Sequence, residues 1–158
     1  MDSEEYNRIA SKYIDTVYRA AYSCCKNKAD AEDAVQNTFM KLLGTDIEFS
    51  DDEHIKKWLI RVAVNECKNL WKSFRWRNII SLNDLEKEPE YNEPYENEIF
   101  SEVMKLPHKY RTVIHLYYYE GYSVKETAQI MGISESNVQV RLLRARKKLK
   151  EILEEASL

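Results

Sequence analysis

The chain has 158 residues, enough for one domain or two small ones, and its 24 Lys and Arg against 27 Asp and Glu give a formal charge of −3. Its 32% charged and 44% hydrophobic residues are typical of a soluble globular protein, and only three Gly and three Pro argue against a sandwich or barrel and favour long helices. Without an apolar run long enough to cross a bilayer, a signal-peptide core, or metal-type spacing of its three cysteines, it is expected to be a cytoplasmic protein with reduced thiols.

The first two predicted elements are helices over residues 4–25 and from about Asp30 to a stop at Gly44. The second has a predicted buried stripe of Ala31, Ala34, Val35, Thr38, Phe39 and Leu42. Its other face carries Glu32, Asp33, Gln36 and Lys41. Carboxylates in a first turn also suit the helix dipole, so capping is the alternative explanation for Asp30 and Asp33.

A third helix is expected from about Glu53 to Trp76. Its predicted buried side contains Ile55, Trp58, Leu59, Val62, Cys67 and Leu70. Spacings of three and four residues place a basic ridge with one central amide along another side, formed by Lys57, Arg61, Asn65, Lys68, Lys72 and Arg75. Trp71, Phe74 and Trp76 follow among further cations. This pattern suits single-stranded nucleic acid, because cations neutralise phosphates and aromatic rings stack on unpaired bases. We expect Trp58 in the core, and leave core and stacking roles open for Trp71 and Trp76.

The segment after this helix contains two of the three prolines and shows no amphipathic period, which predicts a linker. We therefore expect an all-α protein with two small helical domains, at residues 1–78 and 98–158, joined by a flexible acidic linker at residues 79–97. In the second domain, two supporting helices are expected, one with Ile99, Val103 and Leu106 and a second that starts at Pro107 and contains Val113, Ile114 and Tyr117.

The last two helices are predicted to form a helix-turn-helix. Ser123 and Glu126 make a capping box for a helix that ends at Gly132, and Ser134 caps the next helix, which continues to about Glu155. Ala128 and Val138 lie at the packing positions of this motif. An ordinary helical hairpin with a basic face is the alternative.

The final helix is expected to have a buried seam and a basic face. The seam is predicted to be Val138, Leu142, Ala145, Leu149 and Ile152. The opposite side presents Ser136, Gln139, Val140, Leu143, Arg144 and Lys147. A helix of this width fits the major groove, where short polar side chains and Arg meet base edges and phosphates.

Charge is segregated along the chain. Residues 1–53 carry a net charge of −6, residues 54–77 of +6, residues 78–102 of −7 and residues 103–158 of +4. Two basic blocks separated by an acidic stretch predict two contact surfaces for a polyanion, on two bodies. Solvated helix faces are the alternative interpretation.

In the order and spacing of four stretches, the chain resembles the extracytoplasmic-function sigma factors, the smallest sigma subunits of bacterial RNA polymerase. These stretches are DAEDAVQNTFMKLL, IKKWLIRVAVNECKNLWKS, LPHKYRTVIHLYYYEGYSVKETAQIMGIS and NVQVRLLRARKKLKEIL. The resemblance implies transcription initiation without catalysis, cofactor, metal or small-molecule substrate. It also implies contacts with the β′ clamp helices and β flap of core RNA polymerase and with promoter DNA. An anti-sigma factor, often membrane-anchored, would hold such a cytoplasmic protein inactive at the inner face of the membrane.

The resemblance also implies site residues. Polymerase-binding positions would be Asp30, Glu32, Asp33, Gln36 and Phe39. The single-stranded minus-ten element would be held by Arg61, Asn65, Lys68, Asn69 and Lys72. The duplex minus-thirty-five element would be contacted by Ser136, Asn137, Gln139, Val140, Arg141, Leu143, Arg144 and Lys147, with Arg141 and Lys147 towards phosphates. The loop from Thr45 to Asp52 corresponds to the segment that receives a flipped base, and it is unusually acidic here.

Three other functions fit parts of the chain. A helix-turn-helix repressor or activator explains only the C-terminal half. A metal-dependent nuclease would use Asp30, Glu32 and Asp33, although capping accounts for these carboxylates. A structural adaptor of helical hairpins would lack a salt-sensitive affinity for DNA.

Overall fold

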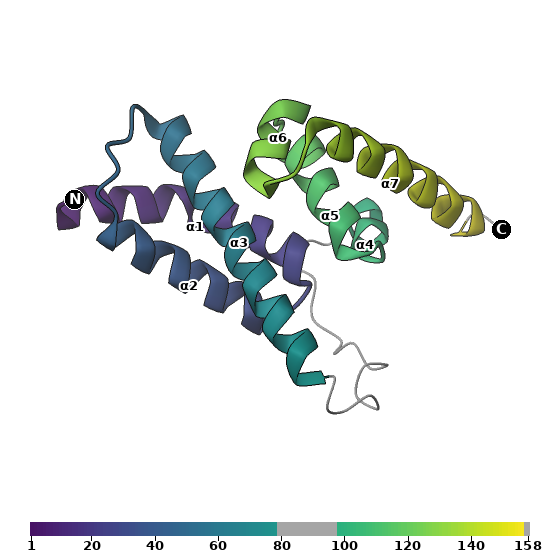
Figure 1. Cartoon of the computed structure of the whole chain (residues 1–158), viewed down its shortest axis with the longest axis horizontal. Helices are drawn as coiled ribbons and strands as arrows, with labels where there is room; N and C mark the ends of the chain where they lie inside the picture. The colour runs from purple at the N-terminus through teal and green to yellow at the C-terminus, as the bar shows by residue number, and fades with distance from the viewer. Residues whose placement is uncertain (79–97, 157–158) are drawn as a thin grey trace. The chain divides into compact units, whose positions relative to one another are not determined.

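A computed structural model of the chain describes residues 1–78 and 98–156, except for the side chains of residues 71, 73–78, 98 and 156. The predicted all-α fold is confirmed, because the described residues form helices and contain no strand (Figure 1). The chain divides into two compact units, Met1–Asn92 and Glu93–Leu158. The linker expected at residues 79–97 lies outside the described residues.

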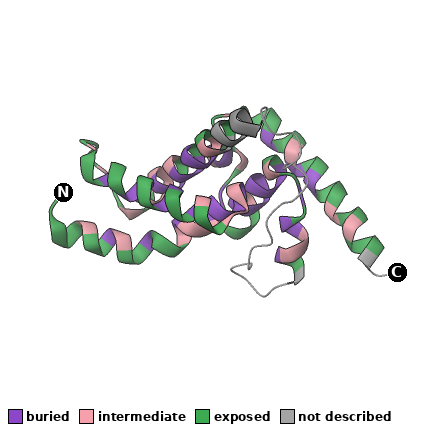
Figure 2. Cartoon of the chain, turned by 90° about the horizontal axis from the view of Figure 1, so that it is seen from below, coloured by how far each residue is buried: buried purple, intermediate pink, exposed green. Residues whose placement is uncertain are grey.

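The described residues of the first unit form three helices, and each packs against the other two. They are α1 (Ser3–Cys25), α2 (Lys28–Gly44) and α3 (Asp52–Asn78) (Figure 1). Every bound lies within two residues of its prediction. Each helix turns one side inward and leaves another exposed, as the alternation of buried and exposed residues along the helices shows (Figure 2). The amphipathic spacing in the sequence therefore identifies the inward face of α2 in full and that of α3 only in part.

Helix α2 begins at Lys28 because the side-chain oxygen of Asn27 accepts a hydrogen bond from the backbone N–H of Asp30 (3.0 Å). The start predicted near Asp30 was two residues late. Asp30 does lie in the first turn, where its charge suits the helix dipole. The side-chain cap, however, is Asn27 rather than Asp30 or Asp33. The predicted buried stripe is confirmed at all six positions.

The predicted buried side of α3 is correct for Ile55, Leu59 and Cys67, but Trp58 is only half-buried. Val62 and Leu70 are half-buried as well. The core prediction for Trp58 was wrong because its ring packs edge-on against Phe49, in the segment between α2 and α3, with ring centroids 5.6 Å apart. The core positions that the prediction missed are Ile60, Ala63 and Val64.

The second unit is formed by shorter helices packed around a long final one. Its elements are α4 (Glu98–Met104), α5 (His108–Ile114), the π-helix η1 (His115–Tyr119), α6 (Val124–Met131) and α7 (Glu135–Ala156). Helix α7 packs on α4, α5 and α6. The helix predicted to continue through Tyr117 instead widens into η1, which brings the rings of Tyr117 and Tyr118 beside the Arg146 guanidinium of α7.

The predicted turn between α6 and α7 is confirmed in detail. Ser123 accepts a hydrogen bond from the Glu126 N–H (3.1 Å), and the Glu126 carboxylate accepts one from the Ser123 N–H (3.2 Å), completing the capping box. Gly132 ends α6 at φ 67°, a left-handed conformation that a glycine adopts without steric cost. Ser134 Oγ then accepts from the Asn137 N–H (3.1 Å) and caps α7.

All three cysteines are free thiols in the first unit, with Cys24 and Cys67 buried and Cys25 half-buried. Hydrogen bonding to Cys24 and Cys25, together with burial, raises the pKa of the Cys67 thiol. A protonated thiol of this kind is a packing group rather than a nucleophile. None of the helices in the described part of the chain is both long and apolar enough to cross a membrane.

Candidate nucleic-acid and protein-binding surfaces

All five predicted polymerase-binding residues belong to α2, but only four of them reach its surface, and the fifth, Phe39, is buried. Glu32, Asp33 and Gln36 are exposed, and Asp30 is half-buried one turn from Asp33. Burial, and after it the negative charge of Asp33, raises the pKa of Asp30. Phe39 is 5% exposed and packs edge-on against Tyr6. Phe39 is therefore a core residue and is not available to a partner on this surface.

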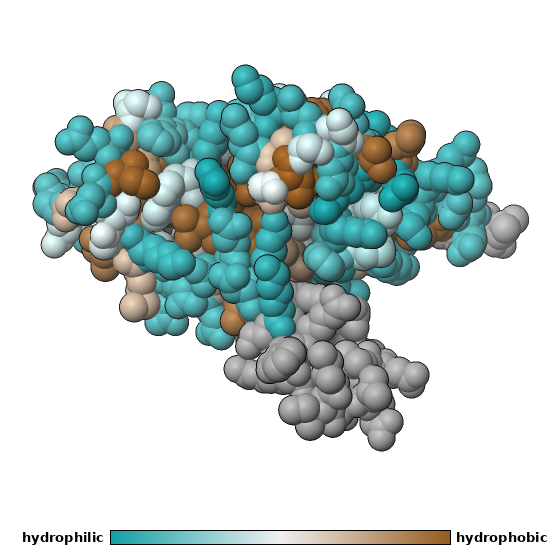
Figure 3. Space-filling model, viewed as in Figure 1, coloured by the Kyte–Doolittle hydropathy of each residue, from teal (hydrophilic) through white to brown (hydrophobic). Residues whose placement is uncertain are grey.

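The same side of α2 continues into two large apolar residues that the sequence analysis missed. Met40 is 62% exposed and Leu43 is 57% exposed. Together with Asp33 and Gln36, they follow the spacing of three, four and three residues that marks one side of a helix, and this spacing could have revealed them. Most of the surface visible in Figure 3 is hydrophilic, with separate apolar patches set in it. Adjacent exposed apolar side chains of this size are typical of an interaction surface.

We define the α2 surface by its exposed and half-buried residues Asp30, Glu32, Asp33, Gln36, Met40 and Leu43. Its N-terminal half is acidic and its C-terminal half is apolar. A partner that fits it therefore offers cations at one end and apolar side chains at the other.

The predicted ridge on α3 lies at the surface. Of its residues, Arg61, Asn65 and Lys72 are exposed, and Lys57 and Lys68 are half-buried. Asn69, which only the resemblance implies as a site residue, is exposed beside them. We call these six residues the α3 ridge. Arg75, the last residue of the predicted ridge, has a side chain outside the described residues, as do the predicted aromatic residues Trp71, Phe74 and Trp76.

The single acidic residue of this basic segment does not oppose the ridge. Glu66 is 9% exposed and faces α2, where its carboxylate pairs with the ammonium of Lys41 and accepts a hydrogen bond from the side-chain amide of Asn37 (3.4 Å). A buried carboxylate is tolerated only when it is paired in this way. The carboxylate of Glu66 is therefore engaged with α2, and the α3 ridge itself contains cations and amides but no acidic residue.

The acidic segment between α2 and α3 is fixed at its C-terminal end. Asp52 accepts hydrogen bonds from the Arg8 guanidinium (3.1 and 3.2 Å) and the Lys12 ammonium (2.7 Å) of α1. These two cations lower the pKa of Asp52 to about 2. Asp51 caps α3 by accepting from the His54 N–H (2.8 Å). Two of the four acidic residues in this segment are thus engaged within the protein.

This segment and the start of α1 enclose a polar hollow of about 500 Å³. Arg8, Asp46, Glu48 and Asp52 contribute to its wall. The ring of Phe49 anchors this segment to α3 by packing edge-on against the rings of His54 and Trp58. The hollow is at the position that the resemblance assigns to the flipped base.

The outer face of α7 is exposed at every position predicted to contact base edges. Ser136, Asn137, Gln139, Val140, Leu143, Arg144 and Lys147 are exposed, and Arg141 is half-buried. We call these eight residues the α7 face. Val138, Leu142 and Ala145 of the predicted seam are buried against the unit, and Leu149 and Ile152 are half-buried.

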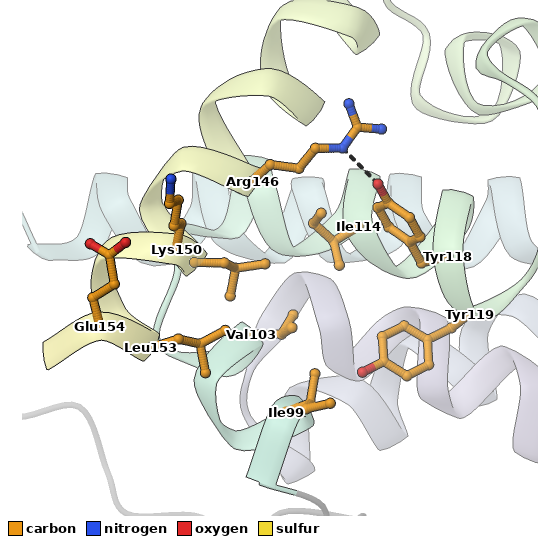
Figure 4. Close-up of a pocket in the computed structure, with 10 residues that line it drawn as sticks. Ile99, Val103, Ile114, Tyr118, Tyr119, Arg146, Lys150, Leu153 and Glu154 are labelled. Carbon is orange, nitrogen blue, oxygen red and sulfur yellow. Dashed lines mark hydrogen bonds between the residues drawn. The ribbon is translucent and has the colours of Figure 1, made fainter. Parts of the chain in front are cut away.

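A second surface of the C-terminal unit is an apolar groove of about 670 Å³ that sequence reasoning missed (Figure 4). Ile99 and Val103 of α4, Ile114 of α5, Tyr118 and Tyr119 of η1, and Leu149 and Leu153 of α7 line it. Arg146 stands at its rim and donates a hydrogen bond from Nε to the Tyr118 hydroxyl (2.6 Å) (Figure 4). The groove is formed by side chains from four separate elements, so no local pattern in the sequence predicts it.

The described residues contain no group of three or more His, Cys, Asp or Glu side chains arranged to hold a metal ion. Asp30, Glu32 and Asp33, the carboxylates of the nuclease alternative, are among the residues covered by this statement.

Comparison with known families and proteins assigns both units. The model of sigma-70 region 2 matches residues 9–77, and that of sigma-70 region 4 matches residues 97–149. The ECF RNA polymerase sigma factor SigM of Bacillus subtilis (strain 168) is 31% identical over 153 residues, covering 92% of this chain and 93% of SigM. The RNA polymerase sigma factor SigV of the same organism is 30% identical over 135 residues, covering 82% of this chain and 80% of SigV.

Two solved structures share the fold. The sigma factor RpoE from Bartonella quintana, crystallised with the anti-sigma factor NepR, has a TM-score of 0.72 and 22% identity, covering 96% of this chain and 98% of RpoE. CnrH, solved with the cytosolic domain of CnrY, has a TM-score of 0.65 and 24% identity, covering 98% of this chain and 90% of CnrH.

Proposed function

This chain belongs to the extracytoplasmic-function (ECF) RNA polymerase sigma factors, and on that basis we propose how its surfaces divide the work of promoter recognition. It is a promoter-directing sigma factor, and its family comprises transcription regulators rather than catalysts. We propose domain limits of 1–78 and 98–158, with residues 79–97 as the linker. The matches to region 2 and region 4 support these limits.

The α2 surface is the proposed docking site for the β′ clamp helices of core RNA polymerase. Its exposed carboxylates favour a basic partner through charge complementarity. Met40 and Leu43 add apolar area that becomes buried on association. Phe39 is left out of this surface, because it is buried in the free protein.

The α3 ridge is proposed to hold the melted non-template strand of the minus-ten element. Its cations neutralise phosphates, and Asn65 and Asn69 offer hydrogen bonds to unpaired base edges. The hollow beside Asp46 and Glu48 is proposed to receive a flipped base. Carboxylates in its wall would accept hydrogen bonds from an exocyclic amino group, whereas they would repel a phosphate.

The α7 face is proposed to read the minus-thirty-five element as duplex DNA. Its central side chains would meet base edges in the major groove, and the cations at its edges would meet phosphates. The capped N-terminus of α7 supports this orientation, because helix N-termini attract phosphate.

The apolar groove is proposed as the contact for the β flap. A concave apolar surface of this kind fits the apolar side of an amphipathic helix. The groove is lined by residues such as Ile99 and Leu153, which do not belong to the α7 face. The chain could therefore bind the β flap and duplex DNA at the same time. Ile99→Asp should weaken association with core polymerase and leave duplex binding unchanged.

An anti-sigma factor is the proposed regulatory partner. Support comes from the structural likeness to RpoE, which was crystallised with the anti-sigma factor NepR. The proposed location is the cytoplasm, or the inner face of the membrane when the partner is anchored there.

One observation carries the proposal most strongly: the described chain exposes an acidic surface and two basic surfaces on separate sides of its helices. The decisive experiment is run-off transcription with purified core polymerase on a promoter library. Specific products are expected only when the chain is present. Duplex binding without polymerase association would contradict the proposal and favour a plain helix-turn-helix regulator.

Two variants test the division of labour in the same assay. Arg144→Ala should weaken duplex promoter binding by about 1–3 kcal/mol and leave polymerase association intact. Asn65→Ala should impair promoter opening more than closed-complex binding, so a pre-melted template should rescue it. A loss of polymerase association in either variant would show that the surfaces are assigned wrongly.

A further inference from the structure

Two side chains of the α7 face are joined to each other. The Arg141 Nε–H donates a hydrogen bond to the Asn137 Oδ1 across 3.0 Å, one helical turn apart. The backbone N–H of Asn137 is bonded to Ser134 Oγ, at the cap of the same helix (3.1 Å). Asn137 is thus held at the first turn by its backbone while its side chain holds Arg141.

This arrangement orients the guanidinium group. A guanidinium is planar and carries five N–H donors, of which Nε supplies one. The other four, on the two terminal nitrogens, have no hydrogen-bond acceptor among the described residues of the chain. Because Asn137 occupies the Nε side, the terminal fork is left as a rigid pair of donors for an external acceptor.

The positive charge of Arg141 also has no ion-pair partner among the described residues. Arg141 is half-buried, and burial lowers the pKa of its guanidinium, with a smaller opposing contribution from Tyr110 of α5. Asn137 is neutral and supplies no counter-charge. A partly desolvated cation without an anionic partner gains most from an anion that offers two oxygens at the spacing of the fork.

The position of Arg141 on the helix indicates whether its partner is a phosphate of the DNA backbone or a base edge. At 3.6 residues per turn, Arg141 lies about 100° round α7 from Val140, which is near the centre of the exposed face. Side chains at the centre of a recognition helix reach base edges, whereas those at its flank reach the backbone that borders the groove. A flank position therefore favours a phosphate over a base.

We propose that Asn137 is a positioning residue that holds the Arg141 guanidinium so that its two terminal nitrogens bind one phosphate of the promoter duplex. This inference rests on the proposed function of the α7 face and changes the role of Asn137, which contacts no base. Arg141 fixes the register of α7 on the backbone, and the central residues of the face read the sequence.

The test is a double-mutant cycle in the full chain, with fluorescence anisotropy on labelled duplexes. One duplex has mixed sequence, and the other is a promoter recovered from the run-off library. Arg141→Ala should weaken binding to both duplexes by the same factor, about tenfold, and reduce the slope of log affinity against log salt by about 1. Asn137→Ala should weaken binding several-fold in the wild-type background and have no further effect when Arg141 is already Ala.

Two further variants separate orientation from charge and from folding. Arg141→Lys keeps the charge and should keep the salt slope, but it should lose most of the affinity because the fork is absent. Asn137→Ala retains the backbone N–H that Ser134 caps, so its helix content by circular dichroism should be unchanged.

Additive losses from Asn137→Ala and Arg141→Ala would overturn the positioning role, because they would mean that Asn137 touches DNA itself. A loss in Arg141→Ala that is confined to the promoter duplex would overturn the phosphate contact in favour of base reading. Either result would leave the proposed function standing, since run-off transcription by the wild-type chain would persist. A wild-type chain that gives no run-off product and binds neither duplex would instead overturn the proposed function together with this inference.

Discussion

Asp52 shows how one side chain can tie two helices together. It begins α3, yet its carboxylate is bonded to Arg8 and Lys12 of α1, and its backbone oxygen accepts a hydrogen bond from the Tyr13 hydroxyl (3.2 Å). These contacts fix the C-terminal end of the acidic segment that borders the proposed base pocket. The position of that pocket therefore depends on ion pairs at the surface.

The pKa of Asp52 provides a direct test of this tie. Its folded value of about 2 lies below its ordinary value of 3.8, so the folded state binds fewer protons than the unfolded state in this window. The stabilisation is therefore complete above pH 3.8 and is lost as the pH falls towards 2. An NMR titration of the Asp52 carboxyl carbon should show a midpoint near 2.

Arg8→Ala removes the largest cause of this shift and should move the midpoint of Asp52 upward, towards 3.8. Lys12→Ala is the matched variant and should move the midpoint less, because the hydrogen bond from Arg8 contributes more than that from Lys12. A wild-type midpoint close to 3.8 would show that the ion pairs do not form in solution.

At Lys26, by contrast, the backbone conformation matters more than the side chain. It ends α1 with φ 52° and ψ 29°, a left-handed conformation that glycine adopts more easily than any residue with a Cβ. Its N–H still donates to the Tyr22 carbonyl (2.8 Å), so the turn is intact at the cost of local strain.

We expect Lys26→Gly to be more stable than Lys26→Ala by about 1 kcal/mol, since both variants lose the side chain and only Gly relieves the strain. Urea denaturation of the two variants measures this difference. The same pair at Ser11, an exposed position inside α1, is the control, where Gly should be the less stable by about 1 kcal/mol. Equal stabilities at position 26 would contradict the left-handed turn.

Helix α7 illustrates how one element serves both folding and recognition. Leu142 is 2% exposed and packs into the unit, whereas the next residue, Leu143, is 67% exposed on the α7 face. The two leucines have the same chemistry, and only their direction from the helix axis differs. Helical periodicity therefore assigns one to stability and the other to contact.

This contrast leads to a matched pair of substitutions. Leu142→Ala should destabilise the C-terminal unit by about 2–5 kcal/mol, because it leaves a cavity in the core. Leu143→Ala should change stability by less than about 0.5 kcal/mol and instead alter promoter preference. Hydrogen exchange of α6 and α7 amides measures the first effect, and run-off transcription measures the second. Similar protection in both variants would show that the faces of α7 are assigned wrongly.

At the scale of the whole molecule, the net charge of −3 conceals surfaces of opposite sign. The acidic segment at residues 1–53 includes the proposed contact for the β′ clamp helices, and both basic segments include proposed DNA contacts. An overall negative charge limits non-specific attraction to nucleic acid, while local cations still bind phosphates. The proposed contact for the β′ clamp helices is thus separated from the proposed DNA contacts by the sign of its charge as well as by its position in the chain.

Salt dependence should therefore report on individual surfaces rather than on net charge. Lys147→Ala, on the α7 face, should reduce the slope of log affinity against log salt by about 1 for duplex promoter DNA. Lys28→Ala removes a cation at the start of α2 that is also exposed, and it should leave this slope unchanged. Equal effects of the two substitutions on the slope would show that binding depends only on net charge.

Most of the fold could be predicted from the sequence because helices are local. The spacing of apolar residues identified the whole buried stripe of α2, and the capping box at Ser123 and the glycine at position 132 marked their turn correctly. For the candidate site, the same spacing placed the α3 ridge and most of the α7 face at the surface. Phe39 differs from these residues because it is buried. The resemblance placed it among the polymerase-binding residues, whereas the helical spacing placed it in the buried stripe of α2.

The sequence by itself determined which residues are helical, which side of each helix is apolar, and where the charges are concentrated, because each of these depends on neighbours within a few turns. Only the tertiary structure decided that Trp58 packs on Phe49, that Glu66 pairs with Lys41, and that an apolar groove opens between α4, α5, η1 and α7. These contacts join residues of different elements, from nine residues apart for Phe49 and Trp58 to 25 apart for Lys41 and Glu66. They follow from which helix faces meet, and periodicity along a single helix carries no information about its partner.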